Sequence, residues 1–175
     1  SVKEVGPATG NGTRQTFLPD ASIFTETVYK YEILATRMRE LAYLNAGITI
    51  VLTDRRVVNE EGKVKSEKFF SENGLKEFVR FIDSSREHLI NDVIYLNTEK
   101  QGIPIEVAIM YNTSFSENIH SYVNNINTIE GGTHLAGFRR ALTRTLKKYA
   151  EDSKMLEKVK IEIAGDDFRE GLTAV

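Results

Sequence analysis

Residues 130–149 of the chain read EGGTHLAGFRRALTRTLKKY, and this stretch decides the prediction of the fold. The two glycines favour a turn, and Thr133 directly after them is a candidate N-cap. Apolar side chains then recur at helical spacing and form one stripe, which consists of Leu135, Phe138, Leu142, Leu146 and Tyr149. The stretch therefore predicts a Gly-Gly turn followed by a long amphipathic helix over about 133–151.

A second face of this predicted helix is basic. Residues 139–148 hold five Lys and Arg and no Asp or Glu. Arg140, Arg144 and Lys147 are spaced by four and three residues, so a helix places them on one side. Such side chains can contact phosphates without recognising a base sequence. The alternative is a solvated face with no ligand, which is the more common meaning of such a pattern on composition alone.

Helices and strands are predicted to alternate irregularly through the rest of the chain. The other predicted helices cover residues 28–45 and 73–85. The predicted strands cover 13–18, 47–53, 93–98, 103–111 and 159–164. Residues 54–68 are expected to form a hairpin or a linker, and 112–132 an Asn-rich loop. Because 93–111 predicts a hairpin among helices, we expect mixed α/β (α+β) layers rather than a purely parallel sheet.

The amino-acid composition limits the classes of protein to which the chain can belong. The 175 residues are 41% hydrophobic and 27% charged, as in a soluble globular protein, and no apolar run approaches the roughly 20 residues that span a bilayer. The absence of cysteine excludes a disulfide framework and any Cys-based zinc site or nucleophile. The net charge of -2 means that any contact with nucleic acid must come from a local basic patch.

Three smaller motifs have both a structural and a functional interpretation. In GTRQTFLPD (12–20), Gly12 permits close backbone approach to a ligand and the Thr13 hydroxyl can donate and accept at once, but composition alone favours the start of a strand. His134 is expected to be a structural hydrogen-bonding residue rather than a catalyst. The acids of GDDFREGL (165–172) have no other acid placed with them, so a turn is the better interpretation.

Four segments of the chain resemble, in order and at similar separations, those of the ATPase subunits of bacterial type IIA DNA topoisomerases. These segments are GTRQTFLPD at 12–20, YEILATRMRELAYLNAG at 31–47, GGTHLAGFR at 131–139 and GDDFREGL at 165–172. Together they cover essentially the whole chain. The variant LAGFR at 135–139 is closer to the gyrase branch of the family than to topoisomerase IV.

The resemblance implies a fold and a set of site residues. Residues 1–55 would be the end of a GHKL (Bergerat) ATPase sandwich. Residues 56–175 would be most of a transducer domain of the ribosomal-protein-S5-domain-2-like type, truncated at its C-terminus, and the chain an internal fragment. Gly12 and Thr13 would bind the nucleotide, with Thr13 beside the adenine. The residues expected to contact DNA, in the cavity through which a duplex passes, are Arg139, Arg140, Arg144 and Lys147.

The resemblance also implies what the parent protein does. It would be an ATP-dependent enzyme that couples ATP binding and dimer closure to DNA strand passage and supercoiling in the cytoplasm, away from membranes. Its cofactors would be ATP and Mg²⁺, and its partners DNA, the gyrase A subunit and a second copy of the ATPase subunit. No residue of this chain matches the family's catalytic ATPase motifs, so no catalytic residue, bound cofactor or metal is expected here. The alternatives are a topoisomerase IV ATPase subunit, a stand-alone nucleic-acid-binding module and a structural scaffold.

Overall fold

The computed structural model describes residues 3–7, 9–10, 15–58, 60–155 and 163–175 of the chain. The chain forms two compact units, Ser1–Lys30 and Tyr31–Val175. In the described part of the first unit, Asp20 accepts hydrogen bonds from the backbone N–H and the hydroxyl of Ser22, at 2.8 and 2.7 Å. Residues 15–18 are not a strand, contrary to the prediction for 13–18, because they pair with no other described segment. Residues 13 and 14 lie outside the described part.

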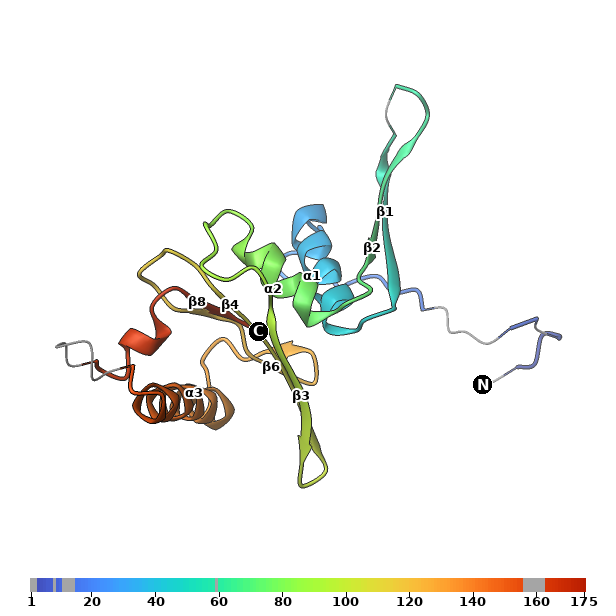
Figure 1. Cartoon of the computed structure of the whole chain (residues 1–175). Helices are drawn as coiled ribbons and strands as arrows, with labels where there is room; N and C mark the ends of the chain where they lie inside the picture. Colours follow the sequence, from blue (N-terminus) through green and yellow to red (C-terminus); the bar gives the residue numbers. More distant parts are fainter. Residues whose placement is uncertain (1–2, 8, 11–14, 59, 156–162) are drawn as a thin grey trace. The chain divides into compact units, whose positions relative to one another are not determined.

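The larger unit begins with a helix packed on a long hairpin, which Figure 1 shows as a two-stranded arm. These elements are α1 (Tyr31–Leu44), β1 (Thr49–Val58) and β2 (Val64–Phe70). Buried Ala35, Ala42 and Phe69 form the core between helix and hairpin. Residues 54–68 are therefore part of a hairpin and not a linker. The predicted domain boundary at 55/56 falls within β1, and its position stays a prediction.

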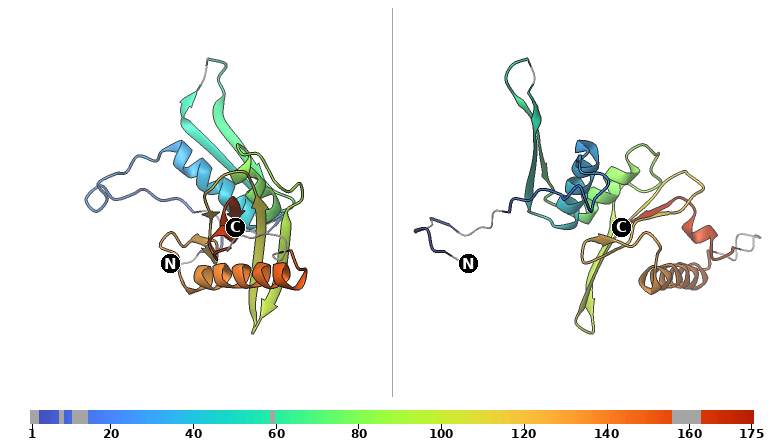
Figure 2. Two further views of the ribbon diagram at one scale, coloured as in Figure 1. Left: turned by 60° about the vertical axis from the view of Figure 1, so that its left-hand side comes forward. Right: turned by 180° about the vertical axis from the view of Figure 1, so that it is seen from behind.

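A four-stranded sheet with the order β3-β4-β8-β5 forms the centre of the unit. The strands are β3 (Ile94–Lys100), β4 (Ile103–Tyr111), β5 (Asn118–Ile119) and β8 (Leu172–Ala174). Successive side chains of a strand point to opposite faces. Ala108 and Met110 of β4 accordingly pack with α2 (Leu75–Asp83), whereas Ile109 packs with α3 (Thr133–Asp152). The two helices therefore cover opposite faces of this sheet (Figure 2).

The Asn-rich loop predicted over 112–132 contains short strands. Besides β5 it forms a small hairpin of β6 (Tyr122–Val123) and β7 (Ile126–Asn127). Asn124 and Asn125 turn this hairpin at φ 49° and 65°, which asparagine tolerates better than most residues. Arg37 donates to the backbone oxygen of Asn125 at 2.6 Å, and the Asn125 amide donates to the Asn45 side chain at 2.9 Å. The turn is thereby fixed against the end of α1.

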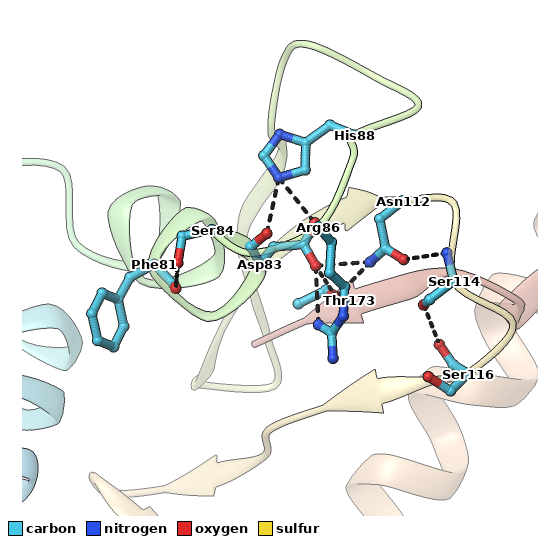
Figure 3. A network of polar contacts seen from close by, with 9 residues as sticks. All are labelled: Phe81, Asp83, Ser84, Arg86, His88, Asn112, Ser114, Ser116 and Thr173. Carbon is cyan, nitrogen blue, oxygen red and sulfur yellow. Dashed lines mark hydrogen bonds and ion pairs between the residues drawn. The ribbon is translucent and has the colours of Figure 1, made fainter.

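A buried polar network ties α2 to the sheet (Figure 3). Asp83, the last residue of α2, has no solvent exposure. Its Oδ1 accepts hydrogen bonds from Asn112 Nδ2 and Thr173 Oγ1, both at 2.7 Å, and from Arg86 Nη1 at 3.2 Å. His88 Nε2 lies 3.2 Å from Oδ2 and 3.2 Å from the backbone oxygen of Asp83. One carboxyl group thus joins the end of α2, the end of β4 and the middle of β8.

The mixed α/β fold class is confirmed, as are the two predicted helices before residue 90, the long helix and the 93–111 hairpin. The strand predicted over 159–164 lies mostly outside the described residues, and its last two residues form no strand. Thr133 as N-cap is wrong, since the cap is Gly132 at φ 155°. A Cβ at that position would lie 2.8 Å from the His134 ring, so the turn excludes a larger residue. No helix in the described part of the chain is long and apolar enough to cross a membrane.

Candidate nucleic-acid interface

The start of α3 is fixed by a short chain of hydroxyl groups. Thr128 Oγ1 lies 3.0 Å from His134 Nε2 in the first turn of the helix and 2.6 Å from Ser121 Oγ. Gly132 closes the first helical hydrogen bond, because its carbonyl accepts from the Ala136 N–H at 3.0 Å. His134 therefore has the structural role that the sequence predicted, and it sets where the basic part of α3 begins.

The apolar stripe of α3 orients its basic face. Phe138 and Leu142 pack against buried Ile109, Leu172 and Ala174 of the sheet. Tyr149, at the far end of the stripe, is 64% exposed, so the stripe contacts the sheet only along the first part of the helix. With the apolar side against the sheet, the opposite side of the helix faces solvent.

An open hollow of about 560 Å³ lies along this side of α3. It brings together every residue predicted to contact DNA, and it adds an arginine from η2 (Asp167–Arg169), the 3-10 helix that lies against α3. We call this surface the basic hollow. Its lining residues are Ala136, Arg139, Arg140, Thr143, Arg144, Lys147 and Arg169.

Two of the five cations in the basic hollow have carboxylate partners. Arg139 Nε donates to Glu117 Oε1 at 2.8 Å, and Arg169 Nε lies 3.4 Å from the same oxygen. Arg169 also pairs with Asp166 and donates to Thr143 Oγ1 at 3.0 Å, which fastens η2 to the helix. Arg139 is therefore an ion-paired side chain, not a free cation.

The other three cations face solvent and have no partner in the described part of the chain. Arg140, Arg144 and Lys147 are exposed, and none of them forms an ion pair or hydrogen bond with another described residue. Clustered cations that no nearby carboxylate neutralises create a positive potential, which attracts anions to their face. The basic hollow is therefore suited to a polyanion that presents several phosphates along one line.

The described residues contain no cluster of side chains that could bind a metal ion. No group of three or more His, Asp or Glu side chains among them could hold a metal ion. Gly12 and Thr13, the predicted nucleotide-binding residues, lie outside the described part of the chain.

Sequence reasoning missed Glu117 and Arg169 as members of this surface. Arg169 lies in the segment GDDFREGL, which was interpreted only as a turn. That interpretation is right for Asp167, whose Oδ2 accepts from the Ala164 N–H at 2.7 Å. Glu117 lies in the Asn-rich loop, where no periodic pattern assigns it to a face. Only the fold brings both residues to α3.

Comparisons with known proteins agree with one another. Residues 74–175 match the family model described as DNA gyrase B. The DNA gyrase B subunit of Cytophaga aurantiaca is 62% identical over 174 residues, which are 99% of this chain and 36% of that relative. The DNA gyrase B subunit of Staphylococcus aureus is 44% identical over 99% of this chain and 27% of its own length. The chain thus spans only 36% and 27% of the length of these two curated relatives.

Solved structures of related proteins have the same fold. The 43K ATPase domain of Thermus thermophilus gyrase B, solved in complex with an aminocoumarin, matches with a TM-score of 0.75 and 30% identity over 90% of this chain and 41% of that one. The B-subunit of the DNA gyrase from Myxococcus xanthus matches with a TM-score of 0.73 over 89% of this chain and 41% of that one. Its identity of 21% supports the fold alone.

Proposed function

The chain belongs to the DNA gyrase B family, and from that premise we propose that it is part of the ATP-hydrolysing B subunit of a DNA gyrase and contacts the DNA backbone through the basic hollow. In this proposal the whole protein couples ATP binding and dimer closure to strand passage and supercoiling. DNA, the gyrase A subunit and a second copy of the whole protein are its partners, ATP and Mg²⁺ its cofactors, and the cytoplasm its location.

The observation that carries the DNA contact is the row of exposed cations on α3 that have no partner among the described residues. A helix rises about 1.5 Å per residue, so Arg140 and Lys147 lie about 10 Å apart along its axis. Duplex DNA carries about six negative charges over that length, at one per about 1.7 Å. Three exposed cations in line therefore meet more phosphates than they can neutralise. They contact the backbone of any base sequence, which suits a surface that must accept any passing duplex.

The nucleotide part of the proposal rests on the family alone. Gly12 and Thr13 are proposed to line the nucleotide pocket of the whole protein, because their segment matches the one that closes this pocket in the family. The chain by itself contains no match to the family's catalytic ATPase motifs. Phosphoryl transfer depends on positioned charge and metal, so the chain alone is proposed to hydrolyse no ATP.

Binding of the purified chain to duplex DNA over a series of salt concentrations tests this function. The test variant is Arg140→Gln/Arg144→Gln, and the control with the same charge change is Lys68→Gln/Lys100→Gln on the two long hairpins. Neutralising Z phosphates gives a slope of about -0.9Z in log K against log salt, so the test variant should lose about 1.8 in slope. The control should keep the slope of the parent chain. A test variant that binds with the same slope as the parent would refute the proposed surface.

A further inference from the structure

Two arginines that line the basic hollow share one carboxylate partner, Glu117. Glu117 Oε1 lies 2.8 Å from Arg139 Nε and 3.4 Å from Arg169 Nε. The Glu117 side chain is 25% exposed and that of Arg169 is 18% exposed, so this ion-paired group is partly buried rather than in free solvent. The Glu117 carboxylate thereby offsets part of the positive charge of the hollow.

The guanidinium groups of Arg139 and Arg169 differ in which of their nitrogen atoms have partners. Arg139 uses Nε for Glu117, and its two Nη atoms have no partner among the described residues. Those atoms form the terminal fork that binds a phosphate with two parallel hydrogen bonds. The Nη atoms of Arg169 are engaged by Thr143, Gly165 and Asp166. Glu117 therefore leaves the fork of Arg139 open while it neutralises much of the local charge.

We propose that Glu117 is an internal counter-ion that offsets the charge of Arg139 and Arg169 toward DNA phosphates and so keeps the grip of the basic hollow weak and reversible. This inference rests on the proposed function of the surface. A phosphate that approaches Arg139 is repelled by the Glu117 carboxylate, and binding releases fewer counter-ions than five free cations would release. A weak grip suits a duplex that must move past the surface and leave it.

Glu117 has a second effect of opposite sign, because it also holds Arg139 in place. If the Glu117 side chain were removed, Arg139 would become more mobile, and ordering it on phosphate binding would cost conformational entropy. The two effects separate in Glu117→Gln, since glutamine keeps a side-chain oxygen that accepts from the Arg139 Nε–H and removes only the charge. Because glutamine keeps the hydrogen bond that holds Arg139 in place, we expect the charge effect to dominate in this variant.

The experiment compares duplex-DNA binding by the chain, Glu117→Gln and the control Glu99→Gln over the same salt series. Glu99 is an exposed residue of β3 and, unlike Glu117, forms no ion pair with Arg139 or Arg169, so its replacement makes the same charge change elsewhere. Glu117→Gln should bind about two- to fivefold more tightly at low salt, and its slope should steepen by up to about 0.9. Glu99→Gln should bind like the parent. In an Arg139→Gln background the gain from Glu117→Gln should shrink. The thermal unfolding midpoint of each variant checks that the fold is kept.

The outcomes separate the two proposals. Suppose that the parent chain binds with a slope that depends on Arg140 and Arg144, but Glu117→Gln binds no more tightly than Glu99→Gln. The counter-ion role is then overturned and the proposed function stands. If neither the parent chain nor Glu117→Gln binds DNA, or if binding ignores Arg140 and Arg144, both proposals fail.

Discussion

Replacing Asp83 by alanine tests whether the polar network under α2 holds the larger unit together. The carboxyl group accepts two hydrogen bonds of 2.7 Å from groups that are themselves buried, Asn112 and Thr173. Alanine leaves both donors without that acceptor, at about 1–3 kcal/mol each. Arg86, which is 31% exposed, is rehydrated and adds little. The free energy of unfolding should therefore fall by about 3–5 kcal/mol.

Asp83→Asn separates the charge from the hydrogen bonds. Asparagine keeps a side-chain oxygen at the position that accepts from Asn112 and Thr173, so we expect a smaller loss of about 1–2 kcal/mol. Urea unfolding followed by far-ultraviolet circular dichroism gives both values from the midpoint and the slope. If Asp83→Ala stays within about 1 kcal/mol of the parent chain, the network does not carry the stability assigned to it.

Two further predictions concern the fold of the larger unit. Gly171 has φ 67°, and a Cβ there would lie 2.1 Å from the Asn112 oxygen, so Gly171→Ala should cost about 3 kcal/mol in urea unfolding. Gly62→Ala is the control, since Gly62 has φ 78° with nothing within 4 Å, and it should cost about 1 kcal/mol. Burial lowers the pKa of His120 from its ordinary 6.5, so the unfolded chain takes up the proton more readily below that pH. The stability that neutral His120 contributes is present above 6.5 and is lost as the pH falls below it. The free energy of unfolding should therefore fall more between about pH 7.5 and 5.5 in the parent chain than in His120→Gln. Equal decreases in the two proteins would refute this prediction.

Local periodicity is the reason that the helices and the central hairpin could be predicted. The apolar spacing of α2 and α3 and the Gln101-Gly102 turn between β3 and β4 are properties of neighbouring residues. The two-residue strands could not be predicted in this way, because each exists only through its partner. β5, for instance, is a strand because it runs parallel to β8 from the far end of the chain.

The basic hollow was predictable in part for the same reason. Arg140, Arg144 and Lys147 share a face because of their spacing on one helix. The charge state of the surface was not predictable, since Glu117 and Arg169 reach it from a loop and from η2. Thr133 was a reasonable N-cap by residue type, but the turn needed a φ that glycine adopts freely, and so the cap is Gly132.

Residue-resolved mapping of the DNA contact tests the central claim most directly. Amide and arginine side-chain signals of the isotopically labelled chain would be followed by NMR as a short duplex is added. We predict that the largest shifts fall on Arg140, Arg144 and Lys147, with smaller ones at Arg139 and Arg169, and that salt reverses them. Binding accompanied by its largest shifts on the β1–β2 hairpin, with the signals of α3 unchanged, would contradict the proposed DNA contact.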